Sequence, residues 1–502
     1  MAQLFVRSPG KVAVGDVDAP PAAKPPVPKP PDPILIRNAA DVTTIVDAGI
    51  DHSDPDAQRA ARRKTLLVMF IALGGVFVDA YDFTSLGIGT IQLKQEFHLS
   101  ASAVGLLSAT MAFSAMFGAL FGGYFVDKLG RKDMFLLDLW FFVIAAIGAA
   151  LAPNLTVLII FRLLMGLGVG LDFPVALSFV VEFCDRARRG LFVNSSYVNW
   201  CLAALVGFAA TYIGYVLGAG ENLWRIAVGF GAVPALILLI LRYRYMLESP
   251  LWAAHQGDLK SAARILRKTR KLDVEVHPDA APEPPHRPKS LLHAARNIFS
   301  PHYRPRAILA AVIGCVQSIE YYAVIFYLPV ISQLIFGQSL LNAILGGALF
   351  NAIGLVGSVV QAKVCDRTGL RPLALGGSVL TAVSLFGIAF GHALGSLALQ
   401  GIMLGVFMLG HTTGPGPQGM AYAALSFPTP IRGSAVGWTQ GMLRVGSIMG
   451  FLFFPMVLAA VGFTATFALL AAAPIIIAAA CLLIRWEPIG VDIEAELVPS
   501  HG

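Results

Sequence analysis

Acidic side chains lie inside long apolar segments of this sequence, where a charged group is costly. Asp79 and Asp82 stand three residues apart in one segment, and Asp172 lies in another. A carboxyl group in a medium of low dielectric constant favours its neutral form, so it can take up a proton on one side and release it on the other. We therefore predict Asp79, Asp82 and Asp172 as proton-coupling residues and favour Asp82 within the first pair. The alternative is that one of that pair only binds a neighbouring helix.

Polar and aromatic side chains in a later apolar segment predict a ligand pocket. Glu320 is followed by Tyr321 and Tyr322, and Gln317 lies about one helical turn earlier. His411 occurs in a run rich in glycine and proline, where it could titrate or donate to an anion. A structural role is the alternative for this histidine. We predict these five residues as substrate-binding.

Arg444 is the strongest indication of the charge of a substrate. It lies in an apolar segment between Met442 and Gly446. A planar guanidinium can hold a carboxylate through two parallel hydrogen bonds, which an ammonium group cannot reproduce. We predict that Arg444 binds a carboxylate of the substrate. In the alternative interpretation, it pairs with Glu320 and never contacts the substrate.

The composition places these residues in a membrane. The chain has 502 residues, of which 56% are hydrophobic and 13% are charged, and its mean hydropathy is +0.70. The ranges 321–362 and 373–431 contain no Asp, Glu, Lys or Arg. Because neither range could lie in water, we predict an integral membrane protein.

No motif in the chain indicates an enzyme. The sequence has no G-x-x-x-x-G-K-[ST] run and no His-Glu metal helix, and its five cysteines are widely spaced without a CxxC pair. We expect no catalytic residue, no metal site and no cofactor other than a proton gradient. The basic residues lie in short runs between apolar segments, so we expect no nucleic-acid partner.

The lengths of the apolar runs predict twelve membrane-spanning helices, since about 20 residues cross the hydrocarbon. Long uninterrupted apolar runs exclude barrel strands. We therefore predict an all-α membrane protein with two six-helix halves, 65–243 and 307–485. The predicted helices are 65–91, 101–126, 134–152, 155–181, 192–217, 226–243, 308–331, 340–364, 373–391, 394–425, 435–461 and 463–484.

Three polar regions flank the two predicted halves. Residues 1–64 are rich in proline and predict a disordered tail, 244–306 form a central loop, and 486–502 form a second tail. Lys and Arg gather on alternate connections, including the central loop, and are almost absent from the others. By the positive-inside rule, we predict that both termini and the central loop are cytoplasmic.

An internal repeat relates the two halves. The turn 123–132 contains Asp-Lys-Leu-Gly-Arg-Lys, and the turn 362–371 contains Asp-Arg-Thr-Gly-Leu-Arg. The two aspartates, Asp127 and Asp366, are 239 positions apart, and an Arg-Gly pair recurs after 243 positions. Duplicated halves of this kind are typical of secondary transporters.

At these turns the chain resembles the major facilitator superfamily, whose signature between helices two and three is G-x-x-x-D-[RK]-x-G-R-[RK]. Residues 123–132 match this signature at every defined position. The resemblance implies that the aspartate pairs with a neighbouring helix end in one state and releases it in another. A topology anchor is the alternative. The predicted gating residues are Gly123, Asp127, Lys128, Gly130, Arg131, Lys132, Glu182, Asp366, Arg367 and Arg432.

Within the superfamily, residues 65–494 resemble the branch of sugar porters, phosphate:proton symporters and aromatic-acid:proton symporters. The shared segments are 79–82, 162–174, 248–250 and 427–433. In this branch an arginine at the position of Arg162 is often tied to proton coupling, so we predict Arg162 as a coupling residue. Packing against an acid of helix one is the alternative. Near Arg444, phosphate symporters tend to have lysine, whereas organic-acid members have Arg-x-Gly.

The chain also departs from the pattern of this branch. Leu425 stands where the branch has a glutamate in the second half, whereas Glu182 occupies the equivalent position in the first half. The resemblance therefore implies a charge network that is complete in one half and thinner in the other. The segment 487–494 is a degenerate version of the sugar-porter tail, which weighs against a sugar porter.

Together these observations predict proton-coupled uptake of a small organic anion, aromatic or aliphatic, by alternating access. The alternatives are symport of phosphate or a sugar-like solute with protons, and a membrane sensor that transports nothing. The expected partners are a small-molecule substrate, protons and the lipid bilayer. We expect a monomer in a bacterial inner membrane.

Overall fold

The computed structural model describes residues 33–48, 55–280, 290–326, 328, 331 and 339–497. Among these residues, eleven helical stretches are long and apolar enough to cross a membrane. The last, Thr429–Leu483, is 55 residues long and is interrupted at Gly462, where φ is 76°. This glycine divides the stretch into two crossings, so the described residues contain the twelve predicted spans.

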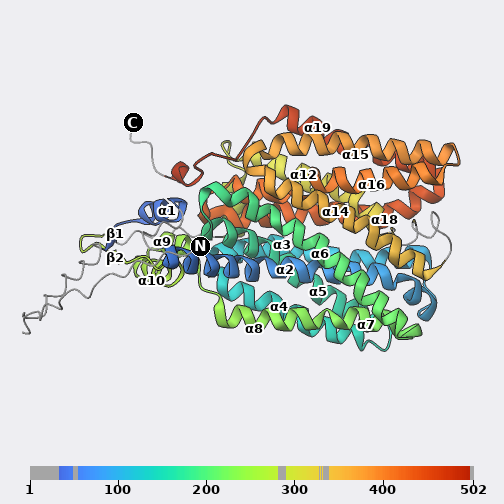
Figure 1. Cartoon of the computed structure of the whole chain (residues 1–502), viewed down its shortest axis with the longest axis horizontal. Coiled ribbons are helices and arrows are strands. Elements are labelled where there is room, and N and C mark those ends of the chain that lie inside the picture. The colour runs from blue at the N-terminus through green and yellow to red at the C-terminus, as the bar shows by residue number, and fades with distance from the viewer. Residues whose placement is uncertain are drawn as a thin grey trace, which may run out of the picture. The chain divides into compact units, whose positions relative to one another are not determined.

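The first half contains six crossings, drawn in blue to green in Figure 1. The sixth crossing consists of two consecutive helices, α7 and α8. The bounds are α2 Pro55–Glu96, α3 Ala101–Leu129, α4 Arg131–Ala150, α5 Leu155–Phe183, α6 Arg189–Val216, α7 Leu223–Phe230 and α8 Ala232–Tyr245, with short 3₁₀ turns η1 Arg186–Arg188 and η2 Gly220–Asn222.

The second half is drawn in yellow to red. Its fourth crossing is broken at Gly414 into two helices, within a run rich in glycine and proline. The bounds are α12 Arg304–Phe326, α14 Leu340–Thr368, α15 Leu370–Ala393, α16 Leu397–Thr413, α17 Pro415–Leu425, α18 Thr429–Leu470 and α19 Ala472–Leu483.

The two halves meet along two pairs of long helices. α3 packs along α18, and α6 packs along α14. Since α3 and α14 are the second crossings of their halves, and α6 and the first part of α18 are the fifth, the interface repeats the internal symmetry of the sequence. Large apolar side chains such as Phe70 and Trp140 are exposed on the outside of the bundle, as expected for surfaces in contact with lipid.

One end of the bundle carries the 123–132 turn and the extramembrane elements, and we call it the loop end (Figure 1). The central segment is not an extended loop, because it contains several short elements. These are α9 Pro250–His255, α10 Leu259–Arg270, β2 Val274–Val276 and α11 Leu291–Ile298, and the chain ends with the 3₁₀ turn η3 Glu494–Leu497.

The predicted disorder of residues 1–64 is wrong for residues 33–48 and 55–64. Residues 33–48, which we call the strap, contain β1 Ile34–Ile36 and α1 Ala39–Ala48, and β1 pairs in parallel with β2. Ile36, Val42 and Val46 are fully buried, so this segment folds by covering apolar surface of the loop end. Residues 55–64 form the first turns of α2, and residues 1–32 lie outside the described residues.

Candidate functional site

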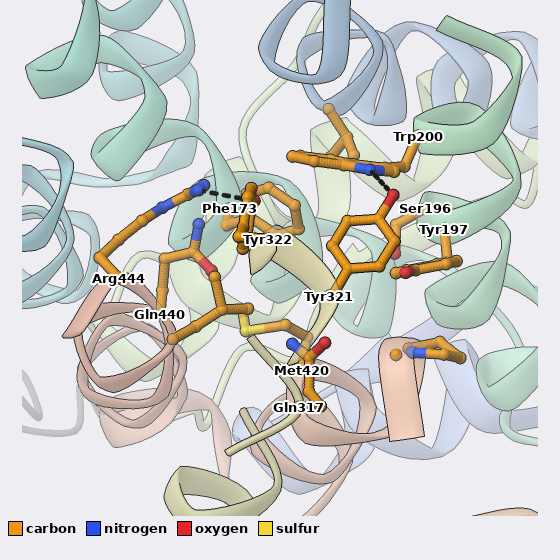
Figure 2. A pocket seen from close by; sticks show the side chains of 14 residues that line it. Phe173, Ser196, Tyr197, Trp200, Gln317, Tyr321, Tyr322, Met420, Gln440 and Arg444 are labelled. Atoms are coloured by element: carbon orange, nitrogen blue, oxygen red, sulfur yellow. Dashed lines mark hydrogen bonds between the residues drawn. The ribbon is translucent and has the colours of Figure 1, made fainter. Parts of the chain in front are cut away.

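A small cavity lies between the halves, and four predicted residues, Gln317, Tyr321, Tyr322 and Arg444, line it (Figure 2). Its volume is about 30 Å³, which is room for about one or two water molecules. A metabolite would fit only after the halves move. The lining residues that the sequence did not reveal are Val76, Phe173, Ser196, Tyr197, Trp200, Gly416, Pro417, Met420, Gln440 and Leu443.

Hydrogen bonds orient the aromatic side chains of the cavity. The indole Nε1 of Trp200 donates to Tyr321 Oη at 3.0 Å, and Arg444 Nη1 donates to Tyr322 Oη at 3.1 Å. Both bonds are visible in Figure 2. The Arg444 guanidinium also lies 4.7 Å from the ring centre of Phe83, a distance at which a cation is attracted by the ring face.

Polar atoms in the cavity wall remain available for a ligand. Arg444 is 1% exposed, and its Nε has no hydrogen-bond acceptor in the described part of the chain. Both amide atoms of Gln440 also lack a partner there. A buried guanidinium without a carboxylate is costly, so the wall can receive an anion or another strong acceptor.

Glu320 and His411 lie close together but do not line this cavity. Glu320 Oε1 and His411 Nδ1 are 3.2 Å apart, and both side chains are fully buried. The alternative prediction of a Glu320–Arg444 pair is wrong, since the ion pairs within the described residues join Glu320 to His411 and none of them contains Arg444.

The predicted coupling residues of helix one lie beside the cavity, in the core of the first half. Asp79 and Asp82 are buried, and none of their four carboxylate oxygens has a hydrogen-bond partner among the residues described. Arg162 Nη1 donates to the backbone carbonyl of Asp82 at 3.3 Å, and its charge is close enough to act on the Asp82 carboxyl. Asp79 is within electrostatic reach of Arg444.

Asp172 belongs to a different group, a buried ion triad. Arg242 Nη2 donates to Asp172 Oδ1 at 2.8 Å, and Arg242 Nη1 donates to both carboxylate oxygens of Asp138 at 3.0 Å. The triad joins α4, α5 and α8 inside the first half. No functional role was predicted for Arg242 or Asp138 from the sequence, although an aspartate in the middle of an apolar helix was a usable signal.

At the loop end, Asp127 connects the two halves. Its Oδ1 accepts from the Gly433 backbone N–H at 3.0 Å, and its Oδ2 accepts from the backbone N–H and the hydroxyl of Ser434 at 2.8 and 2.7 Å. Gly123 allows this approach, because a Cβ there would overlap the Gly433 carbonyl and lie 3.0 Å from Gly437 Cα. The predicted gating aspartate thus holds the start of α18.

Asp366 makes the equivalent contact from the second half to the first half. Its Oδ2 accepts from the Leu191 backbone N–H at 2.9 Å, and Leu191 lies in the first turn of α6. The repeated aspartates therefore hold the repeated helix starts, one from each half. Arg367 and Lys128 are exposed and form no ion pair within the described residues; Lys128 Nζ lies 5.4 Å from the ring centre of Tyr124.

Two glutamates cap the helices that follow the gating turns. Glu248 accepts from the backbone N–H groups of Arg131 at 2.9 Å and Lys132 at 3.1 Å. Burial raises the pKa of Glu248 despite these bonds. Gly130, with φ of 105°, lets the chain turn over this carboxylate. Glu487 caps α15 in the same way, accepting from the N–H groups of the first two residues of the helix.

Glu182 bridges the halves as a buried carboxylate. Its Oε1 accepts from Arg131 Nη2 at 2.7 Å and from Arg432 Nη1 at 3.2 Å. Arg432 also pairs with Glu494 of the C-terminal segment. Burial would raise the pKa of Glu494, but the charges of Arg432 and His255 outweigh it and hold this pKa well below the usual range.

The strap supplies an acidic partner for Arg189, which the second half does not supply because it has Leu425 at the position of the expected glutamate. Arg189 is the first-half counterpart of Arg432, and it pairs with Asp47 of α1. Its Nε donates to the Val181 carbonyl at 3.0 Å, just as Arg432 Nε donates to the Ala424 carbonyl at 3.1 Å. The strap therefore contributes a carboxylate for Arg189 from elsewhere in the sequence, whereas Arg371 of the second-half turn forms no ion pair within the described residues.

The twelve crossings in two pseudo-symmetric halves, the central cavity and the repeated turns 123–132 and 362–371 define a major facilitator transporter. Residues 64–494 match the family described as Sugar (and other) transporter. The chain belongs to this family, and it is an integral multi-pass membrane transporter and not an enzyme.

Curated relatives are similar over most of their length. The putative metabolite transport protein YwtG of Bacillus subtilis is 29% identical over 431 residues, which cover 84% of this chain and 91% of YwtG. The major myo-inositol transporter IolT of Bacillus subtilis is 28% identical, over 74% of this chain and 80% of IolT.

Solved structures share the fold. The proton:xylose symporter XylE bound to 6-bromo-6-deoxy-D-glucose superposes with a TM-score of 0.75 at 20% identity, over 86% of this chain and 98% of that chain. The inward-open conformation of the xylose transporter XylE from E. coli gives a TM-score of 0.63 at 18% identity, over 86% and 98% of the two chains.

Proposed function

We propose that this protein couples the uptake of a small organic anion to protons by alternating access. The observation that carries this proposal is Arg444, a buried guanidinium in the cavity wall that has no carboxylate partner among the described residues. A carboxylate of the substrate would complete its hydrogen bonds and offset its charge. Tyr322, which already accepts from Arg444, would fix the direction of the guanidinium.

Protons would enter the cycle at Asp82. Its carboxyl is buried, lacks a hydrogen-bond partner within the described helices and lies near Arg162. A protonated Asp82 and an ionised Asp82 would hold Arg162 differently, so protonation can bias the arrangement of α2 and α5. Asp79 and Asp172 stay as secondary coupling candidates, Asp79 through its reach to Arg444 and Asp172 through Arg242.

A sugar or polyol is the second candidate substrate. Gln317, Gln440 and Trp200 line the same cavity, and amide and aromatic groups suit a neutral polyhydroxyl compound. The names of IolT and XylE give myo-inositol and xylose as substrates of relatives. On this reading Arg444 would donate to hydroxyl groups rather than to a carboxylate.

We further propose that the protein is a monomer of a bacterial inner membrane with its loop end in the cytoplasm. The lysines and arginines of the loop end support this orientation. Asp127, Asp366 and Glu182 would then close the cytoplasmic side and release it when the cavity opens inward.

Uptake by purified protein in liposomes tests the proposal. The panel contains labelled benzoate, succinate, inorganic phosphate, xylose and myo-inositol, each with and without a proton ionophore. For a carboxylate, Arg444→Lys should weaken the apparent affinity about tenfold to a hundredfold, since each charge-assisted bond is worth roughly 1.5–3 kcal/mol, and Arg444→Gln should weaken it further.

Two results decide between the candidates. Uptake of xylose or myo-inositol with unchanged affinity in Arg444→Gln would overturn the organic-anion proposal in favour of a neutral substrate. If the ionophore left uptake unaffected, transport would not be coupled to protons.

A further inference from the structure

The Glu320–His411 pair is a buried acid–imidazole contact inside the second half that the proposed cycle does not use. His411 stacks on Tyr321, with ring centres 4.7 Å apart and planes at 15°, and on Phe407 at 5.8 Å and 25°. Glu320 Oε2 and His411 Nε2 have no hydrogen-bond partner in the described residues. Aromatic packing thus holds the pair together while leaving one nitrogen of the imidazole available.

Within the described residues, no other charged side chain reaches the pair. α14 up to Ala362, α15 from Leu373 to Gly391 and the whole of α17 contain no Asp, Glu, Lys or Arg. From α18, Arg444 is directed to Tyr322 and to the ring of Phe83. Among the described residues, the titratable groups next to the pair are the phenols of Tyr321 on α12 and Tyr197 on α6, whose ring centre lies 6.4 Å from that of His411. The thiol of Cys201 on α6 is within electrostatic reach of both phenols.

With only each other as counter-ions, the two groups favour the state in which their charges sum to zero. In that state the pair holds two protons: one lies in the hydrogen bond between Glu320 Oε1 and His411 Nδ1, on either atom, and the second is on Nε2. Release of the Nε2 proton to water leaves a carboxylate that still accepts from Nδ1–H of a neutral imidazole. One proton leaves, and the contact that joins the helices persists.

The Nε2 atom faces the cavity across a glycine. A Cβ placed on Gly416 would lie 2.9 Å from His411 Nε2 and 2.7 Å from Tyr197 Oη. Gly416 and Tyr197 both line the cavity. The imidazole therefore lies directly behind the cavity wall, at a position where Gly416 has no side chain. Gly416 follows by two residues the break between α16 and α17 at Gly414, where a change of angle would open this path to water.

We propose that Glu320 and His411 form a second proton-binding site, located in the second half and connected to the cavity over Gly416. It rests on the proposed proton-coupled transport and assigns a proton to each half: one to Asp82 beside Arg162, and one to the imidazole of His411. The two sites lie on opposite sides of the substrate cavity, so substrate entry and movement of the halves can act on both.

The test is an acid–base titration of the full-length protein in lipid nanodiscs, which needs no substrate. Nitrogen-15 histidine signals are recorded between about pH 5 and pH 9, and the His411 signal is identified by its loss in His411→Gln. We expect this signal to change with pH in the wild type. In Glu320→Gln it should stay that of neutral imidazole at every pH, because a buried imidazolium has lost its counter-ion.

Matched controls use residues outside the pair. Glu221→Gln removes an exposed carboxylate and His392→Gln an exposed imidazole, and both should leave the His411 signal unchanged. Asp82→Asn should also leave it unchanged while abolishing accumulation in liposomes. If Glu320→Gln does not fold, the titration of the wild type still shows whether His411 takes up and releases a proton.

A His411 signal that stays constant with pH in the wild type would overturn the second site, and so would a titration that Glu320→Gln leaves intact. Failure of the proposed function looks different. In that case the His411 signal titrates as expected, but the ionophore leaves uptake unaffected, and the pair binds a proton without coupling it to transport.

Discussion

At the scale of single residues, the first half contains two kinds of buried carboxyl group. One has no hydrogen-bond partner in the described part of the chain and can change its charge, and the other is fixed in an ion pair. Asp82 has no hydrogen-bond partner among the described residues, whereas Asp172 is bonded to Arg242 at 2.8 Å. Both were predicted from the same observation, an aspartate in an apolar helix. The difference between them arises from Arg242 and Asp138, whose meeting depends on the packing of three helices.

Asp82→Asn should abolish accumulation against a gradient while leaving exchange of substrate across the membrane. The amide keeps the shape of the carboxyl but cannot cycle a proton. The measurement is accumulation and counterflow of the active compound of the liposome panel, with Asp133→Asn, on the partly exposed first turn of α4, as the matched control. Accumulation that survives in Asp82→Asn would move the coupling site elsewhere.

Removing Arg242 should destabilise the first half. Arg242→Leu leaves Asp138 and Asp172 as two buried like charges, and breaking a buried pair costs about 3–5 kcal/mol. The thermal midpoint of purified Arg242→Leu in detergent should fall clearly below that of the wild type. Asp138→Asn combined with Arg242→Leu should recover part of this loss, and an unchanged midpoint in the single variant would show that the triad does not hold these helices.

At the scale of elements, the strap is held by apolar packing more than by its ion pair. Burial raises the pKa of Asp47 despite the opposing charge of Arg189. A raised pKa means that the docked strap binds a proton more readily than the free one, so the titration of Asp47 favours docking below its unfolded pKa, and this contribution is lost as the pH rises. Acidification should therefore not release the strap.

Two substitutions compare these contributions. Asp47→Asn should change docking by less than about 1 kcal/mol, whereas Val42→Asp places a charge at a fully buried position and should release α1. Spin-label distances between Thr44→Cys and Ala187→Cys, both exposed, measure docking in a background without native cysteines. If Asp47→Asn released the strap and Val42→Asp left it docked, the ion pair would hold the strap more strongly than the apolar packing does.

The sequence predicted elements better than contacts between them. The twelve crossings follow from the length of apolar runs, which the thickness of the bilayer dictates. Arg444 and Tyr322 were found because polar groups stand out in such runs, but Trp200 and Gln440 were not, since one aromatic or amide side chain carries no periodic signal. The strap was missed because it is anchored by only four buried apolar side chains, Ile36, Ala39, Val42 and Val46, which are too few for a clear periodic signal.

At the scale of the whole molecule, the loop end should lose stability in acid through Glu494. Its pKa is held well below the usual range, because Arg432 and His255 outweigh the effect of burial. Its contribution is present above the unfolded pKa of about 4.3 and is lost as the pH falls through the folded pKa. The thermal midpoint of the wild type should therefore fall in that acid range.

Glu494→Gln isolates this contribution. It should lower the thermal midpoint at pH 7 by an amount equivalent to about 1–3 kcal/mol, since Arg432 keeps its bond to Glu182. The difference from wild type should shrink in acid, where the wild-type carboxylate is itself neutralised. A difference that is constant with pH would assign the effect to packing instead of charge.

Two symmetric contacts help to close the loop end, beside the Glu182–Arg432 pair, and neither of the two touches the cavity. Asp127 holds the N–H groups of Gly433 and Ser434, and Asp366 holds that of Leu191. Their loss should change the populations of open and closed states without altering the lining of the substrate site. For a two-state equilibrium, each 1.4 kcal/mol lost from the closed state shifts the ratio of the states about tenfold.

We therefore expect Asp127→Ala to slow transport strongly with little change in apparent affinity, and Asp366→Ala to do the same more weakly, because Asp127 accepts more hydrogen bonds. Initial rates over a range of concentrations of the active compound separate the two parameters. Lys128→Ala, a neighbour whose side chain forms no ion pair in the described structure, is the matched control. Asp127→Ala that transports at the wild-type rate would reduce the 123–132 turn to a topology anchor, since its bonds to α18 would then not limit the movement of the halves.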